Sequence, residues 1–320
     1  MDNSKTTIPV FFTIDDGYAP YLGVAIKSMI ENASPDYNYK INVIQEGLSD
    51  DYRNKIEKME TENAKIEFFE MKRELDIGED FDGHKLRADY FTLTIYYRLF
   101  IPEMFPEYDK VIYIDSDVAV PGDISKLYNE DLGDNLVGAC PDSSIQHIPE
   151  LVTYTTDAVG MNPGEYVNSG ILLMNTKKMR DVKMDEHFMG LLQKYQFDTV
   201  APDQDYLNAM CNGKIKYLSD VYDIMPVEGA EDRDDAIIIH YNLFSKPWLF
   251  DDIQYEDIFW NYAKMTDFYN DLKEIKENYS DEQKEHDMQS MGNLVSRAVM
   301  ITGQDLTFKN IQDQEGTVRL

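Results

Sequence analysis

Short apolar segments typical of buried strands alternate with segments of helical periodicity along most of this chain. Strands are predicted over residues 8–14, 40–46, 65–70, 110–114, 135–139, 170–175 and 236–240. Helices are predicted over residues 19–32, 50–62, 93–104 and 203–211. Alternating units of this length favour an α/β fold, in which a mostly parallel sheet is flanked by helices and ligands bind at the carboxyl ends of strands.

The pattern changes near residue 255, where charged helical sequence replaces the alternation. We expect a sheet domain over residues 1–254 and a C-terminal extension of one or two helices over residues 255–320. The extension could serve substrate binding or the formation of a homo-oligomer, and the sequence favours neither.

Two carboxylates directly follow the strand predicted over residues 110–114, in the sequence VIYIDSDVAV. Positions i and i+2 of an extended chain face the same way, so Asp115 and Asp117 should point together. Like charges held that close raise each other's pKa unless a cation or a shared proton neutralises them. The pair is therefore a candidate metal site or nucleophile pair, and a plain turn is the remaining alternative.

A second pair of carboxylates, Asp15 and Asp16, ends the first predicted strand and is followed by Tyr18. Asp16 could cap the helix that follows, or the pair could contact a ligand. The tyrosine ring could stack on a planar base.

Two later segments carry further polar groups. Asp203 stands where it could cap the helix predicted over residues 203–211. A histidine that ends a buried strand, as His240 does, is more often structural than a ligand. Lys246 lies nearby in a loop with Trp248, so a neutral imidazole and a compact cation could face one anionic group. Two carboxylates and one imidazole together suit Mn²⁺, or Mg²⁺ as a substitute, better than thiolate-bound metals.

Six segments, in this order along residues 8–250, resemble the retaining glycosyltransferases of family 8. They are FFTIDDGYAPYLGVAIKSM, LTIYYRLFIPEMF, DKVIYIDSDVAV, YVNSGILLMN, PDQDYLNAM and HYNLFSKPW. This family includes bacterial lipopolysaccharide galactosyl- and glucosyltransferases and, more distantly, glycogenin. The resemblance implies a GT-A fold, a UDP-sugar donor and a divalent metal. It also implies transfer of glucose or galactose to a hydroxyl of a lipid-linked glycan, a polysaccharide or a glycoprotein.

The resemblance also implies roles for individual residues. The metal ligands that hold the UDP diphosphate would be Asp115, Asp117 and His240, and Lys246 would stabilise the leaving phosphate. The uracil and ribose would be bound by Asp15 and Tyr18. The donor pocket would be formed by Arg98, Ser116, Asn168, Asp203 and Gln204.

Gln204 would occupy the place of a nucleophile on the far side of the sugar, with Arg98 and Asp203 on the sugar hydroxyls. Because an amide is a feeble nucleophile, a same-face mechanism is favoured over a covalent intermediate. In that mechanism the departing phosphate helps to deprotonate the acceptor.

Three positions depart from the family pattern. Leu243 stands where relatives usually have a glycine that lets the backbone approach a phosphate. Gly17 replaces a side chain that often assists nucleoside binding, and Tyr90 replaces an acceptor-side histidine. The identity of the acceptor therefore stays open.

Composition excludes some partners. The 60 acidic and 30 basic side chains give a formal charge of −30, which repels nucleic acid and anionic lipid surfaces. Cys140 and Cys211 lack the spacing of a disulfide framework or a zinc site and are expected to be buried thiols. Neither a signal peptide nor a membrane-spanning stretch is evident, so the expected compartment is the cytoplasm.

Two alternatives of other classes remain. In a haloacid-dehalogenase-like phosphatase, Asp115 would be the nucleophile and Asp117 the acid/base. Ala119 and the distance of the motif from the N-terminus count against that alternative. The other is a catalytically silent protein that binds sugar nucleotides without turnover, although the intact Asp115, Asp117, His240 and Lys246 argue against it.

Overall fold

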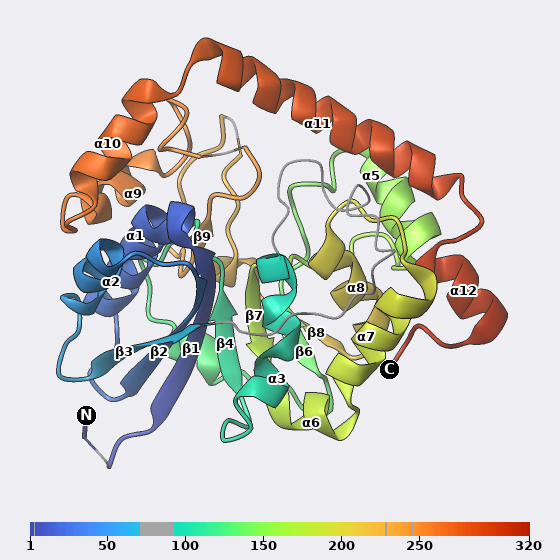
Figure 1. Ribbon diagram of the computed structural model, residues 1–320, viewed down its shortest axis with the longest axis horizontal. Helices are drawn as coiled ribbons and strands as arrows, with labels where there is room; N and C mark the ends of the chain where they lie inside the picture. The colour runs from blue at the N-terminus through green and yellow to red at the C-terminus, as the bar shows by residue number, and fades with distance from the viewer. Residues whose placement is uncertain (3, 71–92, 228, 245) are drawn as a thin grey trace.

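The computed structural model describes residues 1–2, 4–70, 93–227, 229–244 and 246–320 (Figure 1). Tyr90 lies outside the described residues. Within them, a seven-stranded sheet has the order β3-β2-β1-β4-β7-β6-β8. Its strands are β1 (Thr7–Asp15), β2 (Asn38–Glu46), β3 (Ala64–Glu70), β4 (Val111–Ile114), β6 (Val137–Ala139), β7 (Ile171–Met174) and β8 (Ile215–Tyr217). The predicted α/β fold is confirmed.

The sheet is mostly parallel, and its exceptions involve β7. That strand runs antiparallel to both of its neighbours, β4 and β6, whereas β1 pairs in parallel with β2 and β4. The strand predicted over residues 236–240 is only two residues long, β9 (Ile239–His240). It pairs with β5 (Val118–Ala119) outside the main sheet.

Helices cover both faces of the sheet (Figure 1). Those before residue 255 are α1 (Ala19–Glu31), α2 (Asp50–Glu57), α3 (Ile101–Met104), α4 (Ser125–Tyr128), α5 (Pro149–Tyr154), α6 (Thr176–Asp181), α7 (Met184–Tyr195) and α8 (Pro202–Cys211). The helix predicted over 50–62 is too long, since α2 ends at Glu57 and the chain must turn before β3 begins at Ala64. Residues 93–104 are helical as predicted, but Leu93–Phe100 form a 3₁₀ helix before α3.

Alternate residues of the central strands enter opposite core clusters. In β1, Val10 and Phe12 belong to the cluster beneath α1, whereas Phe11 belongs to the cluster on the other face. Because both faces of the strand are covered, its sequence is apolar throughout instead of alternating. Cys140 and Cys211 are free and buried, as predicted.

The segment after residue 255, whose backbone is described throughout, contains four helices where one or two were expected. They are α9 (Glu256–Ala263), α10 (Tyr269–Asn278), α11 (Asp281–Thr302) and α12 (Phe308–Glu315). Phe268, just before α10, packs into the core cluster beneath α1, and Phe308 of α12 packs into the opposite cluster. Between them α11 spans the top of the molecule (Figure 1). A domain boundary at residue 254 stays a prediction.

None of the helices that the structure describes combines the length and apolar character needed to cross a membrane.

Candidate active site

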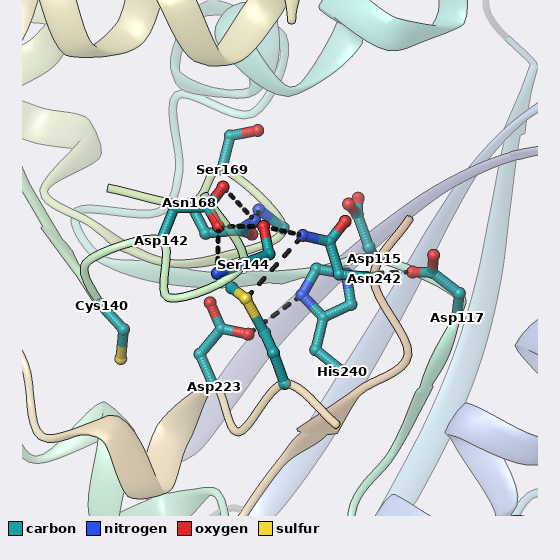
Figure 2. A network of polar contacts seen from close by, with 12 residues as sticks. Asp115, Asp117, Cys140, Asp142, Ser144, Asn168, Ser169, Asp223, His240 and Asn242 are labelled. Carbon is teal, nitrogen blue, oxygen red and sulfur yellow. Dashed lines mark hydrogen bonds and ion pairs between the residues drawn. The ribbon is translucent and has the colours of Figure 1, made fainter. Parts of the chain in front are cut away.

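The two carboxylates after β4 meet His240 through the short β5–β9 pair. Val118 of β5 lies opposite His240 of β9, and the Tyr241 N–H donates to the Asp117 carbonyl at 2.9 Å. One ligand atom from each of Asp115, Asp117 and His240 lies within 4.8 Å of the others. Side chains more than a hundred residues apart therefore converge at one point (Figure 2).

His240 is fixed between two carboxylates. Its Nε2 lies 3.3 Å from Asp117 Oδ1, and its Nδ1 lies 3.0 Å from Asp223 Oδ1 (Figure 2). Burial alone would lower the pKa of His240, but the carboxylates of Asp117 and Asp223 outweigh it and raise the pKa to about 10. The second carboxylate oxygen of Asp223 is buried and has no hydrogen-bond partner. The Asp223 carboxylate thus has one described hydrogen-bond partner, the imidazole.

Asp117 also contacts the Lys246 ammonium, which lies over the Trp248 ring at 5.4 Å from its centroid. Burial opposes ionisation of Asp117, but Lys246 and His240 overcome that cost and hold its pKa well below the usual range. This carboxylate is therefore charged at neutral pH.

Asp115 is held from the other side of the sheet. Tyr113 donates to its Oδ1 at 2.7 Å and is itself 2.8 Å from the Thr13 hydroxyl. The Arg98 guanidinium reaches the same oxygen at 3.0 Å. Burial is the largest effect on Asp115 and raises its pKa, while Arg98 opposes the shift.

Arg98 connects this carboxylate to the start of α8. Its Nε lies 3.1 Å from Asp203 Oδ2, and its Nη1 donates to the Ser169 carbonyl at 2.7 Å. The two terminal nitrogens thus contact Ser169 and Asp115, whereas Nε is close to Asp203 but makes no hydrogen bond. Arg98 fixes the separation between Asp115 and Asp203.

The expected cap role of Asp203 is wrong. The N-cap of α8 is Ala201, which supplies no side-chain cap, and Asp203 instead accepts from the Ser169 hydroxyl at 2.8 Å. Asp205 closes the turn by accepting from the N–H groups of Val200 and Ala201 at 2.9 and 3.0 Å. Since Pro202 begins the helix, the chain before it is extended and the capping bonds come from within the first turn.

Gln204 is anchored at both ends of its amide. Its Oε1 accepts from the Ser169 N–H, and its Nε2 donates to Asp142 Oδ2, each at 2.9 Å. Asp142 also accepts from Asn168 Nδ2 at 3.3 Å. Asp142 and Asp223 were missed by sequence reasoning. Asp142 follows β6 closely, so its place after a strand was an available signal, whereas nothing in the sequence around Asp223 marks it.

Gly170 lies where the site is tightest. A Cβ at this position would stand 2.4 Å from His240 Cε1 and 2.8 Å from Asp115 Oδ2. Its N–H donates to Asn168 Oδ1, and its carbonyl accepts from the Asp115 N–H, both at 2.7 Å. Only a residue without a side chain fits between these two candidate ligands.

The remaining predicted residues lie around this cluster. Asp15 ends β1, the neighbour of β4, and its Oδ1 accepts from the Tyr18 N–H at 3.2 Å. The cap of that turn is therefore Asp15, and the alternative that assigned it to Asp16 is wrong, because Asp16 accepts from the Ser49 N–H at 2.8 Å instead. Ser116 is buried between the two more exposed aspartates.

Leu243 adopts a left-handed backbone conformation with φ of 52°. This region favours glycine, and a bulky residue there is strained. Leu243 therefore has the left-handed backbone conformation that a glycine at this position would adopt without strain.

Comparisons with known proteins identify the family of this chain. The model of the family "Glycosyl transferase family 8" matches residues 9–252. The chain is 29% identical to a predicted glycosyltransferase of Haemophilus influenzae, over 69% of this chain and 64% of that protein. It is 25% identical to the lipopolysaccharide 1,2-glucosyltransferase of Escherichia coli K12, over 77% of this chain and 74% of the relative.

Two solved structures of LgtC are also similar, and each match covers 81% of this chain and 96% of LgtC. An active-site glutamine-to-glutamate variant gives a TM-score of 0.68 at 28% identity. The galactosyltransferase in complex with donor and acceptor sugar analogues gives 0.66 at 27% identity. With the family model matching most of its length, this chain belongs to glycosyl transferase family 8.

Proposed function

We propose that this chain is a metal-dependent, retaining hexosyltransferase that moves glucose or galactose from a UDP-sugar to a hydroxyl of a glycan. The observation that carries the proposal is the convergence of Asp115, Asp117 and His240 on one point beside Lys246. The E. coli relative is named a glucosyltransferase and LgtC a galactosyltransferase, which supports a hexose donor. Family membership leaves no place for the phosphatase alternative.

The candidate ligands fit a hard divalent ion. Two carboxylates and one imidazole nitrogen are the donor set that Mn²⁺ accepts, with Mg²⁺ as a substitute. Gly170 places no side chain of its own between Asp115 and His240. Asp223 holds His240 Nδ1, so that Nε2 is presented to the site. When bound, the ion would supply positive charge that binds the diphosphate oxygens of the donor.

Lys246 has two roles in this proposal. Without donor, its ammonium neutralises Asp117. With donor bound, it turns to the β-phosphate of UDP, where negative charge grows as the glycosidic bond breaks. The loop that contains Trp248 holds the lysine near both positions.

Gln204 is assigned to the face of the sugar opposite UDP. Its amide is fixed by Ser169 and Asp142, so its oxygen is a preorganised dipole. A neutral amide attacks carbon poorly, which favours a same-face reaction in which Gln204 stabilises the cation-like sugar. The active-site glutamine of LgtC supports the assignment.

The other donor contacts follow the same edge of the sheet. Asp203 is assigned to a sugar hydroxyl, and Arg98 acts mainly by holding Asp203 and Asp115 in place. Asn168 and Ser116 complete the pocket wall. At the end of β1, Asp15 and Tyr18 are assigned to the ribose and uracil.

The test measures UDP release from UDP-glucose and UDP-galactose with Mn²⁺, Mg²⁺ or EDTA, in the presence and absence of sugar acceptors. We expect metal-dependent release with one of the two donors, and loss of it in Asp117→Ala. The anomeric configuration of the product, read by NMR, tests retention. Donor binding without turnover under any acceptor would overturn the proposal in favour of a silent binding protein, and full activity in EDTA would overturn the metal site.

A further inference from the structure

A pocket lies directly beside Gln204. It has about 520 Å³ of empty space, part of which is open solvent. Polar groups of Asp142, Ser144, Gln204 and Asn242 line it. Its apolar lining includes Leu151, Leu243 and Leu294. No lysine or arginine is among the described residues that line it.

Leu294 reaches this pocket from the C-terminal extension. It belongs to α11, which spans the top of the molecule (Figure 1). The C-terminal half of α11 is firmly docked, because Ala298 and Ile301 are buried in a core cluster. The pocket therefore has one wall that comes from outside the region matched by the family model.

The docking of α11 is coupled to the helix that carries Gln204. Arg297 Nε donates to the Thr199 carbonyl at 2.7 Å, and Gln304 Nε2 donates to Asp198 Oδ2 at 3.0 Å. Both acceptors lie in the segment immediately before α8. The hydrogen bonds from Arg297 and Gln304 to residues 198–199 thus hold α11, and with it Leu294, in place relative to Gln204 of α8.

We propose that α11 is the outer wall of the acceptor pocket and that the pocket takes an uncharged sugar ring. A pyranose has hydroxyls at its edge and C–H groups on its faces, and a pocket with a few placed polar groups among apolar walls matches that chemistry. The hydroxyls face Asp142 and Asn242, while the apolar face packs against Leu294 and Leu243. This inference rests on the proposed function.

The charge of the pocket excludes acidic acceptors. Asp142 is the one carboxylate among the described lining residues, and the chain as a whole carries a formal charge of −30. A carboxylated or phosphorylated sugar would meet like charge there, with no lysine or arginine among the described lining residues to pair with. Neutral hexose ends are therefore favoured over sialylated or phosphorylated ones.

Two substitutions at Leu294 test the role of α11. Leu294→Trp should obstruct the pocket and Leu294→Ala should widen it. The same changes at Val299 are the matched controls, since Val299 lies on α11 with 55% of its surface exposed and does not line the pocket. Donor hydrolysis without acceptor reports folding and donor binding in every variant.

The readouts are the KM for methyl glucoside, methyl galactoside and lactose, and binding to an array of neutral and acidic glycans with UDP and Mn²⁺. We expect Leu294→Trp to raise the acceptor KM roughly tenfold or more, the effect of about 1.4 kcal/mol. Donor hydrolysis and both Val299 controls should be unchanged, and neutral glycans alone should bind.

An unchanged acceptor KM in Leu294→Trp would overturn the inference. Binding only to acidic glycans, or to none while donor hydrolysis proceeds, would overturn it as well. If wild-type protein hydrolyses no UDP-sugar, the proposed function itself fails, and the inference with it. The hydrolysis assay separates that outcome from the others.

Discussion

Substitution of Gly170 by alanine should weaken both folding stability and metal binding, because it adds a methyl group at the tightest point of the site. The new Cβ would lie 2.4 Å from His240 Cε1 and 2.8 Å from Asp115 Oδ2, both closer than van der Waals contact permits. Neither neighbour can easily give way. His240 is held by Asp223 and Asp117, and Asp115 is held by Tyr113 and Arg98.

The size of the effect follows from that rigidity. Inserting a methyl group into a well-packed interior costs about 1–3 kcal/mol. If His240 or Asp115 moves to accommodate the methyl group, a candidate metal ligand is displaced. Loss of a group that orients a metal ligand lowers metal affinity roughly 10–100-fold, and we expect Mn²⁺ affinity to fall at least that far. Folding stability and metal binding should therefore both fall.

Gly190→Ala is the matched control. Gly190 lies in α7, and its Cβ would meet no atom within 4 Å. Alanine in a helix interior is more favourable than glycine by about 0.5–1 kcal/mol, so this change should stabilise the protein. Urea unfolding without metal gives the free energies, and electron paramagnetic resonance titration gives Mn²⁺ binding. Wild-type stability together with wild-type Mn²⁺ affinity in Gly170→Ala would refute the reasoning.

Three further predictions concern other parts of the molecule. Gln204→Ala should lower kcat without abolishing it, whereas Asp117→Ala should remove metal-dependent turnover; equal losses in steady-state assays would contradict the same-face mechanism. Asp223→Ala should weaken Mn²⁺ binding roughly 10–100-fold because His240 loses its orienting partner. Asp223→Asn keeps a hydrogen-bond acceptor for His240 and should weaken Mn²⁺ binding less. A calorimetric titration that ranks the two variants in reverse would exclude this role of Asp223. Because the formal charge is −30, moderate NaCl should raise the melting temperature by screening repulsion, and a decrease in Tm would show that local ion pairs dominate.

The local pattern of the sequence was enough to predict the α/β fold and the position of most strands. Most residues of β1 and β4 are apolar on both faces of the strand. Such a pattern can be recognised from neighbouring positions in the sequence alone. Helix ends were less predictable, because the end of α2 depends on where β3 must begin. Asp203 was expected to cap α8, but its pairing with Arg98 and Ser169 takes it away from that role.

The candidate site was predicted unevenly for a similar reason. Asp115 and Asp117 could be identified from their place after a strand, and the ordered motifs pointed to His240 and Lys246. Asp142 follows a strand in the same way but belongs to no recognised motif, and nothing near Asp223 marks it; the importance of both comes from the partners they meet in space.

The sequence by itself determined that two carboxylates would point together at the end of a buried strand, because side-chain direction in an extended chain depends on spacing alone. Only the tertiary structure decided what neutralises them. The two-residue pairing of β5 with β9 brings His240 to Asp117, and the Asp223 contact fixes its ring. The tertiary structure also places Leu294 of α11 in the wall of the pocket beside Gln204. Contacts between residues this distant in sequence depend on the packing of the whole chain, which no local pattern specifies.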